Sequence, residues 1–293
     1  MKIYRPLWTD GAFLAPQQFQ QQSRWDSYVA EVVAKMGIAS TWGVINVEFD
    51  ESALTLSRVS AQKMVVRFQD GTLIDTALAD SLPPVLSLND YADRQSLDIV
   101  LALPLMLANG GNLVPETGTD RPRRFNQEWV KVQDLLGHEQ TDIAVLRHEA
   151  TLRFAHDENK AYMTCPVARL IRNTQGMWEF DSHFIPPLLA CQGSLELRKL
   201  LSEFMHRLVA KRRRLMTLRR ESNEKMADFV VADVSLFWLL NSLNSAEPVL
   251  NEFCTAFTTE RLKEVKINID NNITFIIKIS NLACVLYARV PFI

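Results

Sequence analysis

The sequence predicts an α+β fold in which a β-rich, β-sandwich-like domain precedes a helical region, and two observations support this order. In residues 42–180 the apolar side chains alternate in short runs separated by turn residues, which is typical of strands. In residues 193–253 they recur at helical spacing, and after Gly193 no Gly or Pro interrupts the pattern until Pro248. Because Ile185-Pro186-Pro187 cannot continue a central strand, we place the domain boundary near residue 190.

Length and composition describe a soluble globular protein. The chain has 293 residues, of which 47% are hydrophobic and 23% charged. At roughly 100 to 200 residues per domain, this length predicts two domains. A net charge of -2 argues against wholesale binding of nucleic acid.

Several features indicate a cytoplasmic protein. The opening MKIYRPLWTDG reaches Asp10 before any apolar run develops, so we expect no secretory signal. The apolar segment 273–290 is interrupted by Lys278 and Arg289 and falls short of a membrane span. No CxxC pair occurs, which favours free buried thiols over a disulfide or zinc framework for Cys165, Cys191, Cys254 and Cys284.

The first predicted helix follows an extended lead-in, residues 1–14. Pro16 suits the first helical position because its missing amide hydrogen costs nothing there, and Gly37 supplies the C-terminal stop. Between them, FQQQSRWDSYVAEVVAKM carries apolar residues at helical spacing. We expect the buried side of this helix to consist of Phe19, Tyr28, Val29, Val32, Val33 and Met36.

Strands are predicted from Trp42 onward. They begin with TWGVINVEFD, ALTLSRV and KMVVRF, and Gln69-Asp70-Gly71 is predicted to join the last of these to TLIDT in a hairpin. Residues 98–106 are the most apolar candidate, and Pro104 predicts that this strand lies at a sheet edge or ends near that residue. Later strands are WVKVQDL, DIAVLRHEATLRF, YMTCPVARLIR and MWEF, with a turn over residues 173–176.

The segment 109–125 is predicted to be an exposed, mobile loop. It combines Gly110-Gly111, Pro115, Gly118 and Pro122, which are turn and loop residues. We expect the same exposure for its three clustered cations, Arg121, Arg123 and Arg124.

The helical region is predicted to contain two helices, the first with Ser194 as its N-cap. One helix reaching Ala246 would be about 80 Å long, so we expect one helix from 194 to about 228 and another, capped by Asp233, from about 233 to 246. The second is apolar nearly all round and is predicted to be buried, through Leu236, Phe237, Trp238, Leu239, Leu240 and Leu243. The first carries an apolar stripe for packing against partner helices: Leu197, Leu201, Phe204, Leu208, Leu215 and Leu218.

The other faces of this first helix are strongly basic. No aromatic residue lies among the cations, so nucleic-acid bases would lack a stacking platform. We interpret the cations as a solvated or ion-paired surface, with an acidic protein partner as the main alternative. The seven-residue spacing of Leu201, Leu208 and Leu215 fits an intermolecular coiled coil and an intramolecular bundle equally. The cations are Arg207, Lys211, Arg212, Arg213, Arg214, Arg219 and Arg220.

Nothing in the residue pattern indicates catalysis, a cofactor or a metal site. Gly110-Gly111 lacks the following Gly-Lys-Ser/Thr that cradles phosphates, and no GxSxG elbow occurs. The histidines show no HExxH spacing, and those beside an acid lie in strand or turn segments, where neighbouring side chains point to opposite faces. We therefore predict a protein that is not an enzyme. The histidines are His138, His148, His156, His183 and His206.

The opening WTDGAFLAPQQFQ, residues 8–20, resembles the start of the TssK family of type VI secretion baseplate subunits, also called the ImpJ/VasE family. The family pattern is W-x-x-G-x-x-L-x-P-Q-H-F-Q, and Gln18 stands where the family usually has His. LALPL at 101–105, IPPLL at 185–189 and LLNSLNSAEPVL at 239–250 agree with it, so the likeness covers residues 1 to about 253. The matching positions are Trp8, Gly11, Leu14, Pro16, Gln17, Phe19 and Gln20.

This resemblance implies a structural assembly protein. Family members are trimers with a β-rich shoulder similar to phage receptor-binding proteins, a helical neck and a C-terminal head. The shoulder sits on the baseplate wedge, with subunits TssF, TssG and TssE, and the head docks on the cytoplasmic parts of TssL and TssM. We therefore expect a homotrimeric adaptor between wedge and membrane complex, at the cytoplasmic side of the inner membrane, with shoulder 1–190 and neck 191–253.

The residues of the opening motif are candidates for binding a partner. Trp8, Phe13 and Phe19 are aromatic, and aromatic residues dominate interface hot spots. The alternative is that they staple the first helix to the core of the shoulder.

After Phe253 the chain departs from the family. The next family helix, with its His-Pro-Glu motif, is not found, and KINIDNNITFIIKISN is unusually rich in Ile and Asn. We interpret residues 254–293 as an atypical tail of a truncated or frameshifted product without a head, which would lack the TssL and TssM contacts. A second hypothesis is a β-sandwich module, related to phage tail adaptors, that recognises another ligand through residues 109–125.

Overall fold

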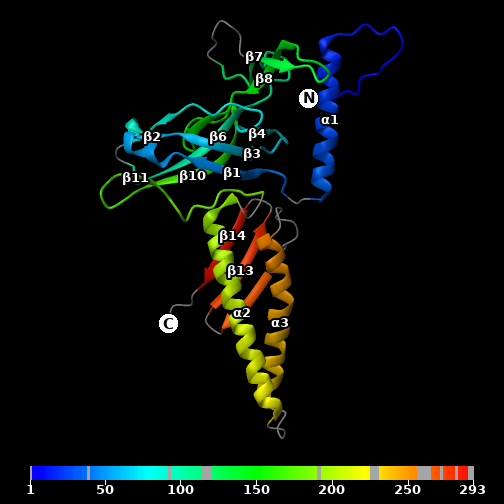
Figure 1. Cartoon of the computed structure of the whole chain (residues 1–293). Helices are drawn as coiled ribbons and strands as arrows, with labels where there is room; N and C mark the ends of the chain where they lie inside the picture. The colour runs from blue at the N-terminus through cyan, green and yellow to red at the C-terminus, as the bar shows by residue number, and fades with distance from the viewer. Residues whose placement is uncertain are drawn as a thin grey trace. The chain divides into compact units, whose positions relative to one another are not determined.

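The computed structural model describes residues 2–37, 40–91, 94–113, 121–189, 193–224, 231–255, 265–270, 273–280 and 283–289. They fall into two compact units, Met1–Asp181 and Ser182–Ile293 (Figure 1). Strands fill the first unit and long helices begin the second, which confirms the α+β class.

The described residues of the first unit contain one long helix and eleven strands. Its elements are α1 (Pro16–Gly37), β1 (Gly43–Phe49), the 3-10 helix η1 (Glu51–Leu56), β2 (Arg58–Val59), β3 (Ala61–Arg67), β4 (Leu73–Asp75), β5 (Leu86–Ser87), the 3-10 helix η2 (Asn89–Tyr91), β6 (Ser96–Pro104), β7 (Phe125–Gln133), β8 (Gln140–His148), β9 (Thr151–Phe154), β10 (Tyr162–Arg172) and β11 (Trp178–Phe180). The second unit contains α2 (Leu195–Glu224), α3 (Val231–Thr255), β12 (Val265–Asp270), β13 (Ile273–Ser280) and β14 (Ala283–Arg289).

Two antiparallel sheets supply the core of the first unit. One has the strand order β1-β3-β4 and the other β11-β10-β6-β9. Met64 of β3 is buried, as are Leu101 of β6 and Leu170 of β10. Phe49 of β1 stacks on Phe180 of β11 with the ring centroids 4.9 Å apart, so side chains join the two sheets. Two smaller pairs, β2-β5 and β7-β8, complete the unit.

Strand β6 is the most deeply buried strand of the first unit. It lies between β10 and β9, and every residue in 99–104 is buried, so both of its faces are covered. The sequence predicted that this strand either lies at a sheet edge or ends near Pro104. The strand ends at Pro104, and the edge position is wrong. β10 accommodates Pro166 at an irregularity, because its register against β6 shifts between Pro166 and Ala168.

The predicted turns around β3 and β10 are confirmed. Phe68 N–H donates to the carbonyl of Thr72 at 2.8 Å, which closes the turn between β3 and β4. Asn173 N–H donates to the carbonyl of Met177 at 2.9 Å between β10 and β11. Local turn residues therefore predict these connections correctly.

The prediction of one strand over ALTLSRV is wrong. The Asp50 side chain accepts a hydrogen bond from Ser52 N–H and caps η1, and Ser57 adopts the left-handed conformation (φ 52°, ψ 46°) that ends it. Only Arg58–Val59 remains as strand β2. The run DIAVLRHEATLRF is likewise divided, into β8 and β9.

Helix α1 has the predicted limits but not the predicted burial. Phe19, Tyr28, Val29 and Val33 are exposed, and Met36 is 80% exposed, so these side chains do not form a buried side. Val32 is half-buried. The helix contacts the β1-β3-β4 sheet through polar groups, and its apolar face is left uncovered in the described part of the chain.

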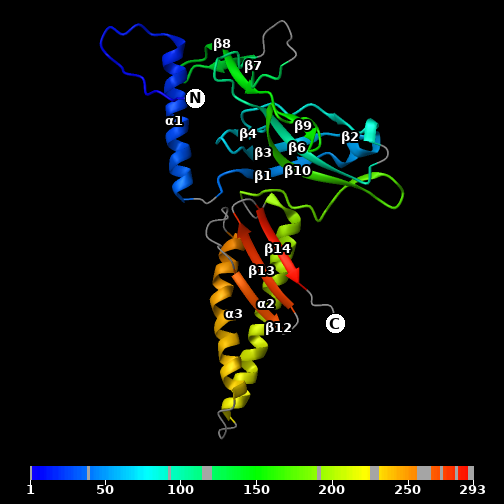
Figure 2. The same ribbon diagram turned by 180° about the vertical axis from the view of Figure 1, so that it is seen from behind.

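Helices α2 and α3 run side by side in both views (Figures 1 and 2). Their shared core is continuous along both helices and consists of Phe204, Leu208, Leu215, Leu240, Leu243, Ala246 and Leu250. Leu197 and Leu201 are also buried. The prediction that the α2 stripe is covered along its length is wrong for Leu218, which is exposed.

Three predictions for α3 are wrong. The helix begins at Val231, so Asp233 lies inside it and is no cap. It continues past residue 246 to Thr255 with Pro248 inside, and Pro248 is exposed, so water can satisfy the backbone carbonyl that the proline leaves unpaired. Phe237 and Trp238 are exposed rather than buried.

The tail after α3 contains an antiparallel sheet with the strand order β12-β13-β14. Within the part of the chain that the structure describes, no helix combines the length and the hydropathy needed to span a membrane.

Candidate partner-binding surface

The residues before α1 fold back along it. Tyr4 N–H donates to the Gln21 side chain at 3.4 Å, and the rings of Trp8 and Phe19 lie 6.0 Å apart. Between them the chain reverses at Gly11, which adopts a positive φ of 72° that favours glycine. The opening motif therefore holds the residues before α1 against that helix.

The start of α1 explains the Pro-Gln-Gln sequence of the motif. The backbone N–H of Ala15 donates to the Gln18 side chain at 2.9 Å, and Gln18 N–H donates to the Ala15 carbonyl at 3.0 Å. The Gln18 side chain thus caps the backbone N–H before the helix, its own N–H closes the first turn, and Pro16 occupies the first helical position. Gln18 thus has a structural role at the place where a His is usual in the resembling pattern.

Apolar side chains of the lead-in and α1 form what we call the N-terminal surface. Phe13 is 88% exposed and has no aromatic neighbour among those described. The other candidates, Gly11, Pro16, Gln17 and Gln20, are exposed as well. If these residues attached α1 to the core of the sheet, their side chains would be buried. That alternative therefore does not explain their exposure. The N-terminal surface consists of Trp8, Phe13, Leu14, Phe19, Tyr28, Val29, Val33 and Met36, all exposed.

Glu31 attaches α1 to the sheet. Its carboxylate forms an ion pair with Arg67 of β3, accepts a hydrogen bond from the Thr41 hydroxyl at 3.3 Å, and lies 3.1 Å from Lys35. Gly71 makes room for it, because a Cβ added there would lie 2.5 Å from the Glu31 Oε2. This polar attachment leaves the opposite, apolar face of α1 open.

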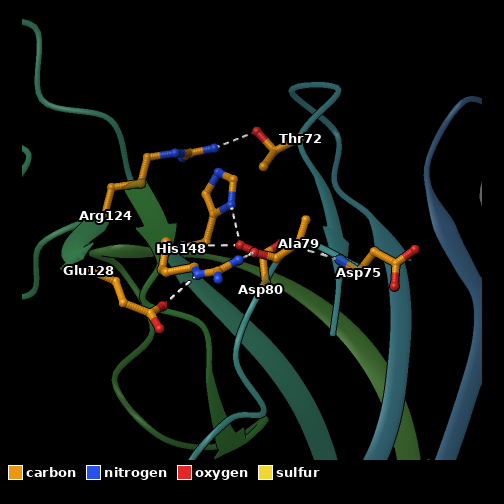
Figure 3. A network of polar contacts seen from close by, with 8 residues as sticks. Thr72, Asp75, Ala79, Asp80, Arg124, Glu128 and His148 are labelled. Atoms are coloured by element: carbon orange, nitrogen blue, oxygen red, sulfur yellow. Dashed lines mark hydrogen bonds and ion pairs between the residues drawn. The ribbon is translucent and has the colours of Figure 1, made fainter. Parts of the chain in front are cut away.

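A second candidate element is the hairpin of β7 and β8, which starts from a group of charged and polar residues that we call the root cluster (Figure 3). Arg124 is only 2% exposed. It donates to the Pro104 carbonyl at 3.0 Å, to the Asp70 carboxylate at 2.5 Å and to the Thr72 hydroxyl at 2.6 Å. Arg124 is therefore buried, and its predicted exposure is wrong. The root cluster consists of Asp70, Thr72, Asp80, Arg124, Arg147 and His148.

At the same end of the hairpin, Arg147 and His148 hold the end of β8, and Figure 3 shows His148 beside Asp80. The His148 Nδ1 lies 2.9 Å from Asp80 Oδ1, and the His148 backbone N–H donates to the same oxygen at 3.1 Å. Arg147 donates to the Ala79 carbonyl and, from Nε at 2.6 Å, to the Glu128 carboxylate. Both strands of the hairpin are thus tied to residues 70–80 at its root.

Hydrogen bonds keep the two acids of the root cluster ionised. Burial raises the pKa of Asp80, but hydrogen bonds from His148 and Asp75 outweigh it, so the pKa lies below its ordinary value of 3.8. Burial likewise raises the pKa of Asp70, while Thr72 and Arg124 lower it further than burial raises it. The carboxylates therefore complement the cations at neutral pH.

Sequence reasoning missed the root cluster. Asp70 and Arg124 are separated by 54 residues, and Asp80 and His148 by 68. No local spacing relates such residues, and only the approach of the hairpin to the β4 region brings them together. The predicted loop 109–125 lies partly outside the described residues, since 114–120 are not among them.

Beyond the root cluster, the hairpin is exposed on both faces. Its strands pair only with each other among the described strands. Large apolar side chains are exposed along the strands and at the tip: Trp129, Val132, Leu135, Leu136, Ile143 and Leu146.

The basic surface of α2 is partly ion-paired. Arg212 contacts Glu247 of α3 at 2.9 Å, and Arg207 pairs with Glu203. Arg219 lies over the ring of Phe237, with its guanidinium carbon 5.7 Å from the centroid. These contacts agree with the interpretation of an ion-paired surface.

Two chemical features of the described residues bear on catalysis. No three His, Cys, Asp or Glu side chains there are grouped closely enough to hold a metal ion. Burial raises the pKa of the Cys165 thiol to about 12, so this thiol stays protonated and unreactive at neutral pH.

Comparison with known proteins identifies relatives of this chain. A family model for bacterial type VI secretion, whose description names EvfL, ImpJ and VasE, matches residues 18–260. The type VI secretion system baseplate component TssK1 of Pseudomonas aeruginosa is 23% identical over 253 residues, which are 83% of this chain and 54% of that protein. The chain therefore spans about half the length of this curated relative.

Two solved structures are more similar in sequence. A chain in a structure of the type VI secretion baseplate complex is 60% identical with a TM-score of 0.82, over 87% of this chain and 58% of that one. A chain in the cryo-electron microscopy structure of the TssK-TssF-TssG baseplate subcomplex is 56% identical with a TM-score of 0.80, over 88% and 82%.

Proposed function

Because the chain belongs to the bacterial type VI secretion family that includes EvfL, ImpJ and VasE, we propose that it is a structural subunit of the type VI secretion baseplate. It acts by holding other proteins in place, without chemistry of its own. The relatives support this proposal, since one is named a baseplate component and two others are chains of baseplate assemblies.

The N-terminal surface is the observation that carries the proposal. A helix that is attached through its polar side leaves its apolar side in water. A partner protein that covers this side removes apolar surface from water, which favours binding. Exposed aromatic side chains such as Trp8, Phe13 and Phe19 suit the centre of such an interface. We assign the N-terminal surface to binding within the baseplate.

The partners that fit this role are TssF and TssG, which form a baseplate subcomplex with TssK in one of the similar solved structures. TssE completes the wedge in our proposal, and the chain associates as a homotrimer through its helical unit. TssL and TssM, at the cytoplasmic side of the inner membrane, are the expected contacts of a head that we do not find after Phe253, so for this chain we propose only the wedge side of the adaptor role. The N-terminal surface concerns the wedge side of this adaptor.

Binding of the whole chain to a co-expressed TssF–TssG complex tests the proposal. We expect the double variant Trp8→Ala/Phe13→Ala to bind at least about tenfold more weakly, because hot-spot aromatics each contribute about 2 kcal/mol or more. Leu78→Ala is the matched control, because Leu78 is as exposed as Phe13 but lies outside the N-terminal surface. Failure of the folded wild-type chain to bind would refute the proposal.

A further inference from the structure

The tip of the β7–β8 hairpin, residues 134–139, presents two adjacent leucines entirely to solvent. Leu135 is 101% exposed and Leu136 is 98% exposed. Turns normally carry Gly, Asn, Asp, Ser or Pro, each for a backbone reason, and leucine serves none of these. These two side chains contribute nothing to the packing of the described chain.

The tip has an ordered backbone. Asp134 N–H donates to the Glu139 carbonyl at 2.9 Å, and Leu136 N–H donates to the Asp134 side chain at 3.1 Å. The Gln133 side chain donates to the Gly137 carbonyl at 3.4 Å. The backbone that carries the two leucines is therefore held in one conformation.

The root cluster holds the other end of the hairpin. Arg124, Arg147 and His148 each bond to residues 70–80, so the hairpin has charged or polar anchors at the start of β7 and at the end of β8. A loop whose backbone is ordered before binding loses less entropy when it binds. The backbone of the tip is thus pre-organised for contact.

The charges near the tip select among possible partners. Asp134 and Glu139 flank the leucines, and Asp142 follows on β8, where it lies opposite Lys131 of β7. An anionic bilayer surface would repel this acidic tip. A protein surface with Lys or Arg around an apolar pocket would attract it and would cover the leucines.

We propose that residues 134–139 form a docking knob whose two leucines enter an apolar pocket with a basic rim on a baseplate partner protein. This inference rests on the proposed function, because it takes the partner from the TssF–TssG complex. It adds a second contact to that of the N-terminal surface. The pocket supplies hydrophobic burial, and its rim pairs with the acids that flank the leucines.

Affinity for the TssF–TssG complex, measured with the whole chain, tests the inference. Leu135→Ser/Leu136→Ser should weaken binding at least about tenfold, since burial of two leucines is a large part of a typical interface energy. Glu139→Lys should also weaken binding, and it should reduce the loss of affinity that added salt causes in the wild type. The control Glu158→Lys makes the same charge change in a distant exposed turn and should bind normally.

Folding is checked on each variant by circular dichroism and thermal unfolding, which fully exposed side chains should not alter. Wild-type affinity in the folded leucine variant would overturn the knob while leaving the proposed function intact. Absence of wild-type binding would overturn both. A leucine variant that binds TssF–TssG normally but loses self-association in light scattering, or loses binding to anionic vesicles, would assign the tip to a second copy or to lipid and overturn the inference.

Discussion

Helices α1 and α2 start from the same kind of sequence, a helical run with one apolar stripe, and have opposite environments. In α2, Leu208 and Leu215 are buried against α3. In α1, Val33 and Met36 are exposed. The difference lies in the element that follows: α2 precedes a second apolar helix, whereas α1 precedes a sheet whose apolar residues pack against another sheet. Periodicity therefore predicts which residues share a face, while burial depends on whether the chain supplies a cover.

The largest effect should come from the covered face. Leu208→Ala removes a side chain with 0% exposure and should lower the free energy of unfolding by about 3 kcal/mol, because a buried Leu→Ala change costs about 2–5 kcal/mol. Leu218→Ala, on the same helix but exposed, should cost less than about 1 kcal/mol. Chemical denaturation followed by helical circular dichroism measures both. Equal losses of unfolding free energy would show that Leu218 is buried too. They would contradict the difference between covered and uncovered residues.

Arg124→Met tests whether the hairpin depends on its buried anchor. The change removes the donor of the Pro104 carbonyl and leaves Asp70 with Thr72 but no cation. It should cost about 2 kcal/mol of the free energy of unfolding, less than for a fully buried pair because Asp70 is partly exposed. Arg123→Met is the matched neighbour, since Arg123 bonds only to the Gly111 carbonyl among the described contacts, and it should cost under about 1 kcal/mol. Chemical denaturation of each variant gives the comparison.

Gly71→Ala tests the attachment of α1 to the sheet. Gly71 and Gly110 have nearly the same φ, 88° and 86°, but a Cβ at Gly71 would collide with Glu31 whereas one at Gly110 would meet nothing within 4 Å. Each alanine should cost about 1 kcal/mol for backbone strain, and Gly71→Ala should cost more through the displaced carboxylate. Hydrogen exchange should then increase in α1 for Gly71→Ala only. Equal losses of stability and equal hydrogen exchange in the two variants would contradict the role of Glu31 in attaching α1 to the sheet.

Acid should weaken the root cluster. The pKa values of Asp70 and Asp80 in the folded chain lie below their ordinary value of 3.8, so the unfolded chain binds more protons as pH falls through that value. Their stabilising contribution is present above about pH 4 and is lost below it as the pH approaches the folded pKa values. Asp80→Asn should reduce the slope of unfolding free energy against pH below about pH 4. An unchanged slope would contradict the assignment.

The smallest effect should come from the uncovered face of α1. Val33→Ala removes an exposed side chain and should change the free energy of unfolding by less than about 0.5 kcal/mol. A loss near that of Leu208→Ala, measured in the same denaturation experiment, would mean that α1 is covered and that the comparison is wrong.

Features set by neighbouring residues could be predicted from the sequence. Pro16 and Gly37 bound α1, and the turn at 173–176 joins β10 to β11, because each depends on the backbone preferences of the residues present. The predictions that failed involve competing local interactions. Asp50 caps a 3-10 helix inside an alternating run, and α3 passes through Pro248 because packing against α2 outweighs one lost hydrogen bond.

The candidate surfaces could be predicted only in part. The opening motif indicated Trp8, Phe13 and Phe19, and in the structure all three are exposed and the rings of Trp8 and Phe19 are neighbours, while their role in binding stays a prediction. The root cluster could not be predicted, because Arg124 meets Asp70 only through tertiary approach. The exposure of Leu135 and Leu136 needs a folded hairpin before it can be recognised.

Strands β6 and β7 differ in how freely their sequences can change over evolution. Every residue in 99–104 of β6 is buried, so a new side chain there must fit the packing on the face of the sheet to which it points. No residue of β7 is fully buried, and a substitution there affects the described core little. Single substitutions could therefore adapt the hairpin to a changed partner protein during evolution, while the sequence of the β6 sheet stays nearly constant.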